Sequence, residues 1–257
     1  MQIHDRIVAL ALLAGAALAQ AQGSRVELPT REGVTTALYW EPVAGATATV
    51  LLLPGGGGGF GPVKGGRPSS PNFLVRSAAH FAAQGFNVAI LGRPSDMAEL
   101  GFEERTGENH LADVRRVIEH LKRERDVPVW LVGTSRGTVS ATAAAIRAQA
   151  PIAGLVLSAS VVRHDRPGAL PRQDLAAIQV PVLLLHHRDD ACPICRPHEV
   201  PAVLRGLVNA PARKLVMLDG GGPPAGDPCG PLHWHGFVGI ERAAVDLIAA
   251  WIRRPTN

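Results

Sequence analysis

Short aliphatic runs recur along the chain from about residue 48, and each is followed by a longer stretch of mixed polar and apolar residues. The runs are nearly continuous, which is typical of parallel strands that are covered on both faces of a sheet. They predict strands at residues 48–53, 87–91, 129–132, 155–158, 182–185 and 215–218. Before them, residues 25–41 alternate in polarity and contain β-branched and aromatic residues, which predicts an opening hairpin.

The stretches between the predicted strands have the periodicity of helices. The clearest lies at residues 108–125, where the apolar positions share one stripe: Leu111, Val114, Ile118 and Leu121. Further helices are predicted at residues 72–84, 138–149, 199–208 and 240–253. This alternation predicts a single α/β domain with a doubly wound, mostly parallel sheet of about eight strands. A barrel of eight strand–helix units also alternates, but an opening hairpin has no place in it.

The first apolar run of the chain has a different character. Residues 7–19 are apolar apart from Gly15, follow a head that contains Arg6, and precede small residues. This is the layout of a secretory signal peptide, with cleavage after Ala19 or Ala21. The run is too short to cross a hydrocarbon core, which needs about 20 residues in a helix. We expect residues 1–21 to be removed and residues 22–257 to form the domain. The protein is then periplasmic or secreted, without stable membrane insertion.

Composition and charge narrow the classes of protein further. Of the 257 residues, 46% are hydrophobic and 19% are charged, which indicates a globular chain and not a disordered one. Its 28 glycines and 21 prolines interrupt every stretch that is long enough for a coiled coil. The net charge of +4 comes from arginines scattered along the chain, so we expect no nucleic-acid partner.

One short motif points to chemistry. Residues 133–137 read GTSRG, the pattern G-x-S-x-G, directly after a predicted strand and directly before a predicted helix. A nucleophile elbow needs this context, because the sharp turn strains the serine backbone and leaves no room for a Cβ at the flanking glycines. Ser135 would then lie exposed at the start of a helix, where the helix dipole favours developing negative charge. The alternative is an ordinary turn in which Ser135 only caps the helix.

With this motif in this context, residues 47–251 resemble an α/β-hydrolase of the serine-esterase type with a small or absent cap. The resemblance implies an acid and a histidine that follow the serine in chain order. Residues 181–190 (PVLLLHHRDD) are similar to the strand and turn that carry the acid, and aligning His186 with the family's histidine favours Asp190 over Asp189. Residues 235–237 (HGF) are similar to the segment before the last helix and favour His235 over His233.

The resemblance also implies an oxyanion hole. Residues 54–59 read PGGGGG directly after the first predicted parallel strand, where the family has a loop of the H-G-G-G type. The resemblance assigns the two backbone N–H donors of the oxyanion hole to Gly56 and to Arg136, the residue after the nucleophile. The run is not a phosphate-binding loop, because Lys64 lacks the required spacing. We expect no cofactor and no metal, since the nearby histidines and aspartates at residues 186–190 are too crowded for tetrahedral ligation.

Three cysteines lie close to the expected acid and histidine. Export would place them in an oxidising compartment, where one disulfide and one remaining thiol are expected. If Asp190 and His235 meet, a bridge between Cys192 and Cys229 would join their two loops, and we favour this pair. The pairs Cys195–Cys229 and Cys192–Cys195 remain open. Residues 192–195 also form a C-x-x-C pattern, which is typical of thiol–disulfide oxidoreductases and supplies a rival function.

Together these features lead to one expected activity. The resemblance implies a carboxylesterase-like serine hydrolase that acts on a small-molecule acyl substrate through an acyl-enzyme. Lactonase, peptidase and acyltransferase activities on the same triad remain open, as does the oligomeric state. About 20 residues separate the predicted strands at 155–158 and 182–185, which is too few for a large cap. We expect an open cleft, with residues 60–71 available as a small flap. Arg136 is a candidate for binding a substrate carboxylate or for packing on the surface.

Overall fold

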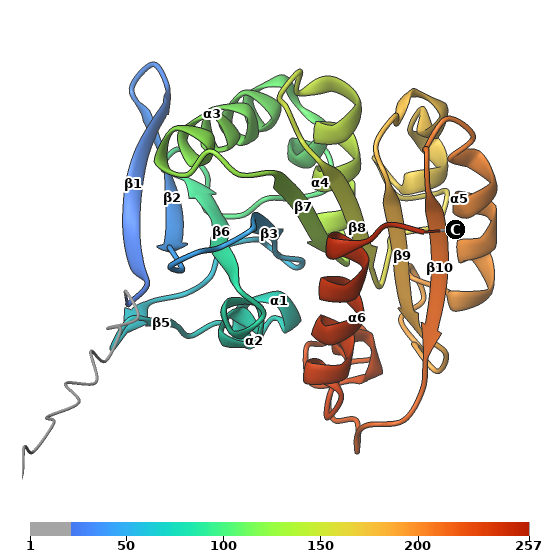
Figure 1. Ribbon diagram of the computed structural model, residues 1–257. Helices are drawn as coiled ribbons and strands as arrows, with labels where there is room; N and C mark the ends of the chain where they lie inside the picture. Colours follow the sequence, from blue (N-terminus) through green and yellow to red (C-terminus); the bar gives the residue numbers. More distant parts are fainter. Residues whose placement is uncertain (1–21, 257) are drawn as a thin grey trace, which may run out of the picture.

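The computed structural model describes residues 22–256, so the predicted signal peptide at residues 1–21 lies outside the described residues. Eight strands form one sheet in the order β1-β2-β6-β3-β7-β8-β9-β10 (Figure 1). The strands are β1 (Ser24–Arg31), β2 (Val34–Glu41), β3 (Ala48–Leu53), β6 (Phe86–Pro94), β7 (Val129–Thr134), β8 (Gly154–Ser158), β9 (Val182–His187) and β10 (Arg213–Leu218). This arrangement confirms the predicted α/β class and the number of strands.

The antiparallel part of the sheet is confined to one edge. β1 pairs with β2 and β2 pairs with β6 in antiparallel fashion, which is the predicted opening hairpin joined to the main sheet. All other neighbours pair in parallel. Every residue of β3 and β7 is buried, which explains why these strands appear in the sequence as unbroken aliphatic runs.

Helices cover both faces of the sheet. They are α1 (Phe73–Arg76), α2 (Ala78–Ala83), α3 (Glu108–Glu124), α4 (Arg136–Arg147), α5 (Val200–Gly206) and α6 (Glu241–Arg253). The helices α1, α2 and α6 pack on one face together with Val50 and Leu52 of β3. The helices α3, α4 and α5 pack on the other face together with Leu51 and Leu53. This division follows from the alternation of side chains along a strand.

The helix predicted at residues 72–84 is wrong, because the structure has two short helices there. The chain bends at Ser77, which has φ −92° and ψ 2° and separates α1 from α2. Ser77 is both the C-cap of α1 and the N-cap of α2. Serine is less favourable than alanine inside a helix and is favoured at caps, which agrees with a break at this position.

The structure contains no large cap within residues 22–256. Between β8 and β9, the chain forms only the 3-10 turns η2 (Leu170–Arg172) and η3 (Leu175–Ala177). The expected flap at residues 60–71 carries a small hairpin, β4 (Val63–Lys64) with β5 (Arg67–Pro68). Its first residue, Phe60, is buried against the ring of Tyr39, so this segment is anchored to the core. No helix of the described residues is both long and apolar enough to span a bilayer.

The topology creates a crevice between the two central strands. The chain passes from β3 to β6 on one side, and from β7 to β8 on the other, although β3 and β7 are neighbours. In doubly wound sheets, ligands bind where the strand order reverses, at the carboxyl ends of the strands. The glycine-rich residues 54–59 follow β3 and Ser135 follows β7, so both lie at this crevice.

Candidate active site

Ser135 lies on a strained turn between β7 and α4. Its φ of 52° and ψ of −127° place a residue with a side chain in a region that L-residues rarely adopt. A Cβ at Gly133 would lie 2.6 Å from the carbonyl oxygen of Gly137, and a Cβ at Gly137 would lie 1.9 Å from that of Leu53. The flanking glycines are therefore required by close backbone contacts, and the turn has the strand–turn–helix geometry of a nucleophile elbow.

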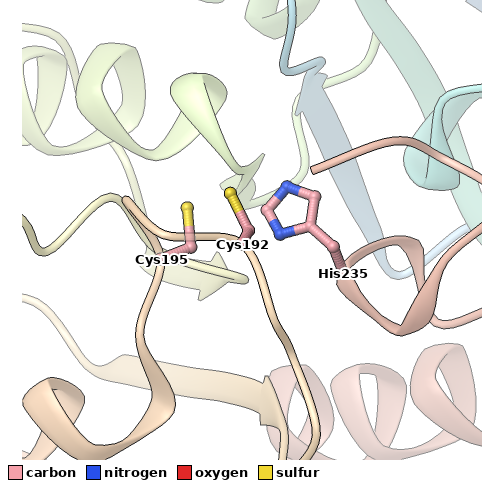
Figure 2. Close-up of side chains that lie close together, drawn as sticks. All are labelled: Cys192, Cys195 and His235. Atoms are coloured by element: carbon pink, nitrogen blue, oxygen red, sulfur yellow. The ribbon is translucent and has the colours of Figure 1, made fainter. Parts of the chain in front are cut away.

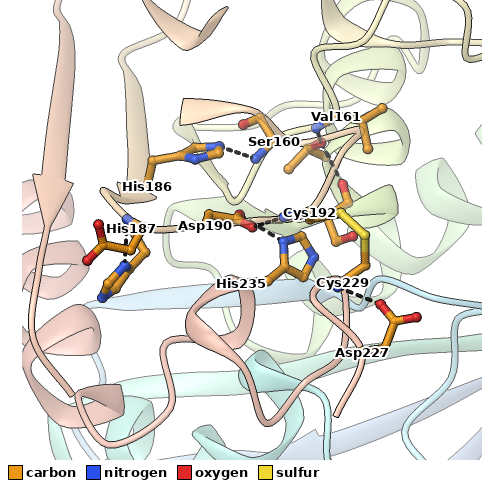
Figure 3. Close-up of polar contacts among 12 residues, drawn as sticks. Ser160, Val161, His186, His187, Asp190, Cys192, Asp227, Cys229 and His235 are labelled. Atoms are coloured by element: carbon orange, nitrogen blue, oxygen red, sulfur yellow. Dashed lines mark hydrogen bonds and ion pairs between the residues drawn. A yellow bond between two sulfur atoms is a disulfide. The ribbon is translucent and has the colours of Figure 1, made fainter. Parts of the chain in front are cut away.

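Asp190 and His235 meet across two loops that are far apart in sequence. Asp190 follows β9, and His235 lies in the 3-10 turn η5 (Trp234–Gly236) before α6. The Nδ1–H of His235 donates to Oδ2 of Asp190 at 2.8 Å, and both side chains are almost fully buried (Figure 3). Oδ1 of Asp190 accepts a second bond, from the backbone N–H of Cys192 at 2.9 Å. These bonds leave Nε2 of His235 as the free acceptor of the ring.

The structure separates the two pairs of neighbours that the sequence left open. Asp189 is exposed to solvent, and its backbone N–H donates to Nδ1 of His187. His233 packs edge-on against the ring of Trp234, with 5.4 Å between ring centroids. Only Asp190 and His235 form the carboxylate–imidazole pair among the residues of these two loops that the structure describes.

Ser135, His235 and the glycine loop (residues 54–59) line the same pocket. The pocket has a volume of about 230 Å³ and is lined by residues 55–59, by Ser135 and His235, and by parts of the loops at 70–73 and 229–236. Gly55 lies against Ser135, because a Cβ there would approach the Cβ of Ser135 to 2.8 Å. Among the described residues, Nε2 of His235 has no hydrogen-bond partner, so the hydroxyl of Ser135 is not bonded to it here.

The loop around His235 is held from the opposite side by α1. The guanidinium of Arg76 donates to the carbonyl oxygen of Gly236 at 2.6 Å and pairs with Glu241 at 2.9 Å. The ring of Phe237 packs against Phe73, with 4.8 Å between centroids. These contacts hold the backbone that directly follows His235, which limits the positions that the imidazole can take.

Two links connect the loop that carries Asp190 (the acid loop) to the loop that carries His235 (the histidine loop). The first is a disulfide between Cys192 and Cys229, the pair that the sequence favours. The second is His187, whose Nε2 donates to the carbonyl oxygen of Gly220 at 2.9 Å and whose ring stacks on Trp234. His187 follows His186, the residue that was aligned with the family's histidine. Its bridging role depends on the tertiary contact with Gly220, which no local pattern indicates.

Cys195 has a free, buried thiol beside Ser135, a placement that the sequence did not indicate. Its sulfur, the sulfur of Cys192 and a ring nitrogen of His235 all lie within 4.8 Å of one another (Figure 2). Burial raises the pKa of the Cys195 thiol well above its usual value, while contact with the Ser135 hydroxyl opposes this shift. Because Cys192 is already bonded to Cys229, this group offers too few free ligands for a closed tetrahedral metal site.

The C-x-x-C residues and Arg136 are also placed by the structure. Cys192 is bonded to Cys229 and not to Cys195, so residues 192–195 do not form the disulfide of a redox motif. The side chain of Arg136 lies over the ring of Phe102, 4.7 Å from its centroid. This is a packed position, and the Arg136 side chain does not line the pocket beside Ser135.

Comparison with known proteins extends the assignment. Residues 66–174, less than half of the chain, match the family described as serine aminopeptidase, S33. An esterase from Pyrococcus furiosus has a TM-score of 0.68 at 14% identity, over 97% of this chain and 96% of that chain. A serine hydrolase without a lid from Xanthomonas campestris has a TM-score of 0.61 at 20% identity, over 93% and 97%.

A serine hydrolase homologue from Coxiella burnetii has a TM-score of 0.62 at 14% identity, over 91% of this chain and 99% of that chain. No curated protein matches the sequence significantly. The structure from Xanthomonas campestris is described as lacking a lid, and this chain has no large cap within residues 22–256. The chain therefore has the α/β-hydrolase fold and resembles the esterase-like serine hydrolases that share it.

Proposed function

We propose that the protein is a serine hydrolase that cleaves a small ester-like acyl substrate through an acyl-enzyme. One observation carries this proposal. A strained serine opens onto the same pocket as a histidine whose other ring nitrogen is held by a buried carboxylate. Nucleophilic acyl transfer needs a serine, a base and an orienting acid in this relation.

In the proposed reaction, Ser135 attacks the carbonyl carbon while Nε2 of His235 accepts its proton. The Ser135 hydroxyl must first turn toward Nε2, which is free to accept. Asp190 holds the ring in the tautomer that carries the proton on Nδ1, and its charge stabilises the imidazolium that forms. The N–H groups of Gly56 and Arg136 stabilise the oxyanion. The histidine then protonates the leaving alcohol and activates the water that releases the acid.

The size and the lining of the pocket favour a substrate with a short, uncharged acyl group. Its volume of about 230 Å³ lies below the range of roughly 300–1,000 Å³ that is usual for drug-sized ligands. No acidic side chain is among the described residues that line it. An aminopeptidase must neutralise the α-amino group of its substrate, so this lining favours esters. Aminopeptidase activity remains the second candidate, because the matched family carries that description.

We also propose that the protein is exported. Residues 1–21 would direct the protein to the periplasm or the outside of the cell and would then be removed. The disulfide next to the site supports this location, because such bonds persist in oxidising compartments.

Labelling with a fluorophosphonate tests whether the serine is activated. The wild type should be labelled, and Ser135→Ala should lose both labelling and roughly 10⁴-fold or more of its esterase kcat. Ser95→Ala, which removes an exposed hydroxyl away from the pocket, is the matched control and should be labelled normally. Equal labelling of wild type and Ser135→Ala would contradict the proposed nucleophile.

A substrate panel separates the two candidate activities. We expect the highest kcat/KM on p-nitrophenyl esters of two to four carbons, and a much lower value on aminoacyl p-nitroanilides. A clear preference for the anilides would replace the esterase proposal with the aminopeptidase.

A further inference from the structure

A buried arginine lies behind the glycine loop. Arg105, in the 3-10 turn η1 (Glu104–Thr106), is 1% exposed and is the largest fully buried side chain of the described residues. Its guanidinium donates to the carbonyl oxygens of Gly56 at 3.0 Å, Pro54 at 3.3 Å and Leu100 at 3.3 Å. It also donates to Oγ of Ser140 at 2.9 Å. Arg105 forms no ion pair with any described residue.

This environment is unusual for a cation. A buried guanidinium loses its hydration, and proteins ordinarily compensate with a carboxylate. Burial lowers the pKa of Arg105 to about 9, with a further decrease caused by the positive charge of Arg136. The loss is offset here by backbone carbonyls, two of which belong to the glycine loop. The buried charge of Arg105 is therefore stabilised by hydrogen bonds to this particular loop.

The carbonyl oxygens of residues 54–57 all accept hydrogen bonds from the protein. Arg105 binds those of Pro54 and Gly56, the N–H of Gly58 binds that of Gly55, and the N–H of Leu100 binds that of Gly57. In a trans peptide, the N–H points opposite to the carbonyl of the same unit. Fixing the carbonyls of Pro54 and Gly56 toward Arg105 therefore directs the N–H groups of Gly55 and Gly57 away from it. The N–H of Gly56, the proposed oxyanion donor, belongs to the peptide between these two fixed units.

Glycine makes this restraint necessary. Without a Cβ, the peptide between Gly56 and Gly57 can rotate at little steric cost, and Gly56 already has a positive φ of 57°. Such a rotation would change the backbone dihedral angles of Gly56, whose N–H is the proposed oxyanion donor. The bond from Arg105 to the Gly56 carbonyl opposes that rotation directly.

The same guanidinium also contacts the helix that begins at the nucleophile. Ser140 lies on α4, whose first residue is Arg136, the second proposed oxyanion donor. Because Oγ of Ser140 accepts from Arg105, its hydroxyl can donate to Nε2 of His110, 2.9 Å away. Burial and the charge of Arg105 lower the pKa of His110 to about 3, so the ring stays neutral and can accept.

We propose that Arg105 is a positioning residue of the oxyanion hole, which holds the glycine loop and the start of α4 in one arrangement. The inference rests on the proposed serine hydrolase function, because an oxyanion must form at Ser135. Arg105 does not touch the substrate; it preorganises the donors that do.

The test compares Arg105→Lys and Arg105→Met with the wild type. Lysine keeps the charge but cannot bridge several carbonyls, and methionine removes both. On p-nitrophenyl acetate, we expect kcat to fall roughly 10- to 100-fold in both, with KM changed by less than about threefold, because the donors act mainly in the transition state. Affinity for a trifluoromethyl ketone, which forms an oxyanion on Ser135, should fall by the same factor as kcat/KM.

Arg31→Met is the matched control. Unlike the fully buried Arg105, Arg31 is partly buried, and it pairs with Asp96 and Asp113, away from the pocket. This variant should lower the melting temperature without changing kcat. Hydrogen exchange of the amides at residues 55–59 should accelerate in Arg105→Lys and not in Arg31→Met. If neither Arg105 variant folds, Ser140→Ala, which removes one anchor of the guanidinium, should show a smaller loss of kcat at unchanged KM.

The outcomes separate this inference from the proposed function. A wild type that neither hydrolyses esters nor reacts with a fluorophosphonate would overturn both. An active wild type with folded Arg105 variants of unchanged kcat and unchanged affinity for the trifluoromethyl ketone would overturn the role of Arg105 alone. If the Arg105 variants do not fold, an unchanged kcat in Ser140→Ala would overturn the proposed role of Arg105.

Discussion

Asp190 illustrates how much a single side chain depends on its direction. Both of its carboxylate oxygens are used, one by Nδ1 of His235 and the other by the N–H of Cys192. Its neighbour Asp189 carries the same charge but faces solvent. The burial of the Asp190–His235 bond matters because a hydrogen bond to an ionised group is strong when water is excluded. The proposed acid is thus distinguished from its neighbour by its contacts and not by its chemistry.

We expect Asp190→Asn to lower kcat on the order of 10³- to 10⁴-fold. The amide can present its NH₂ group to Nδ1, which stabilises the tautomer with the proton on Nε2 and removes the acceptor that Ser135 needs. Asp189→Asn is the matched control and should keep kcat within about twofold. The measurement is steady-state hydrolysis of p-nitrophenyl acetate by both variants. Equal losses in the two would show that the acid is not assigned correctly to Asp190.

At the scale of elements, the site consists of loops that are joined at the carboxyl end of the sheet. The acid loop after β9 and the histidine loop after β10 are linked by the Cys192–Cys229 disulfide and by His187. The histidine loop is also bonded to α1 through Arg76. Ordering long loops costs conformational entropy, and the cross-links between these loops hold Asp190 and His235 together without a cap.

Removal of the disulfide tests this view. The double variant Cys192→Ser with Cys229→Ser should lose roughly 2–4 kcal/mol of unfolding free energy, because the bridge closes a loop with a sequence separation of 37. Its kcat should fall several-fold, since the histidine loop gains freedom. Cys195→Ala keeps the bridge and should lose less stability. Urea unfolding with and without a reductant measures the effect, and a wild type insensitive to reduction would argue against it.

At the scale of the whole molecule, two buried histidines make stability depend on pH. Burial lowers the pKa of His186 to about 4 and that of His110 to about 3, from an ordinary value of 6.5. Below pH 6.5 the unfolded chain binds protons that these two folded-state rings do not bind, so acidification favours unfolding. Their contribution is complete above pH 6.5 and is lost progressively as the pH falls toward 4.

Between pH 7 and pH 5, we expect the unfolding free energy to fall by about 2 kcal/mol for each of the two rings. His110→Gln should remove about half of this dependence. His198→Gln, at an exposed histidine, is the control and should leave the dependence unchanged. Denaturant unfolding at the two pH values measures all three proteins. The same pH dependence in His110→Gln as in the wild type would contradict the explanation.

The sequence by itself determined the features that depend on short-range rules. Continuous aliphatic runs predicted the parallel strands, and GTSRG between a strand and a helix predicted the strained turn at Ser135. The pattern at residues 72–84 did not reveal the break at Ser77, because the periodicity of apolar residues reports the buried face of a helix and not the position where the helix is interrupted.

Only the tertiary structure decided which distant residues meet. It brought Asp190 rather than Asp189 to His235, paired Cys192 with Cys229, and placed Cys195 beside Ser135. It also placed Arg105 behind the glycine loop, where its bonds reach carbonyls about 50 residues away in sequence. The reason is physical. Steric preferences act over a few residues, whereas hydrogen bonds and burial act between whatever segments the folded sheet brings together.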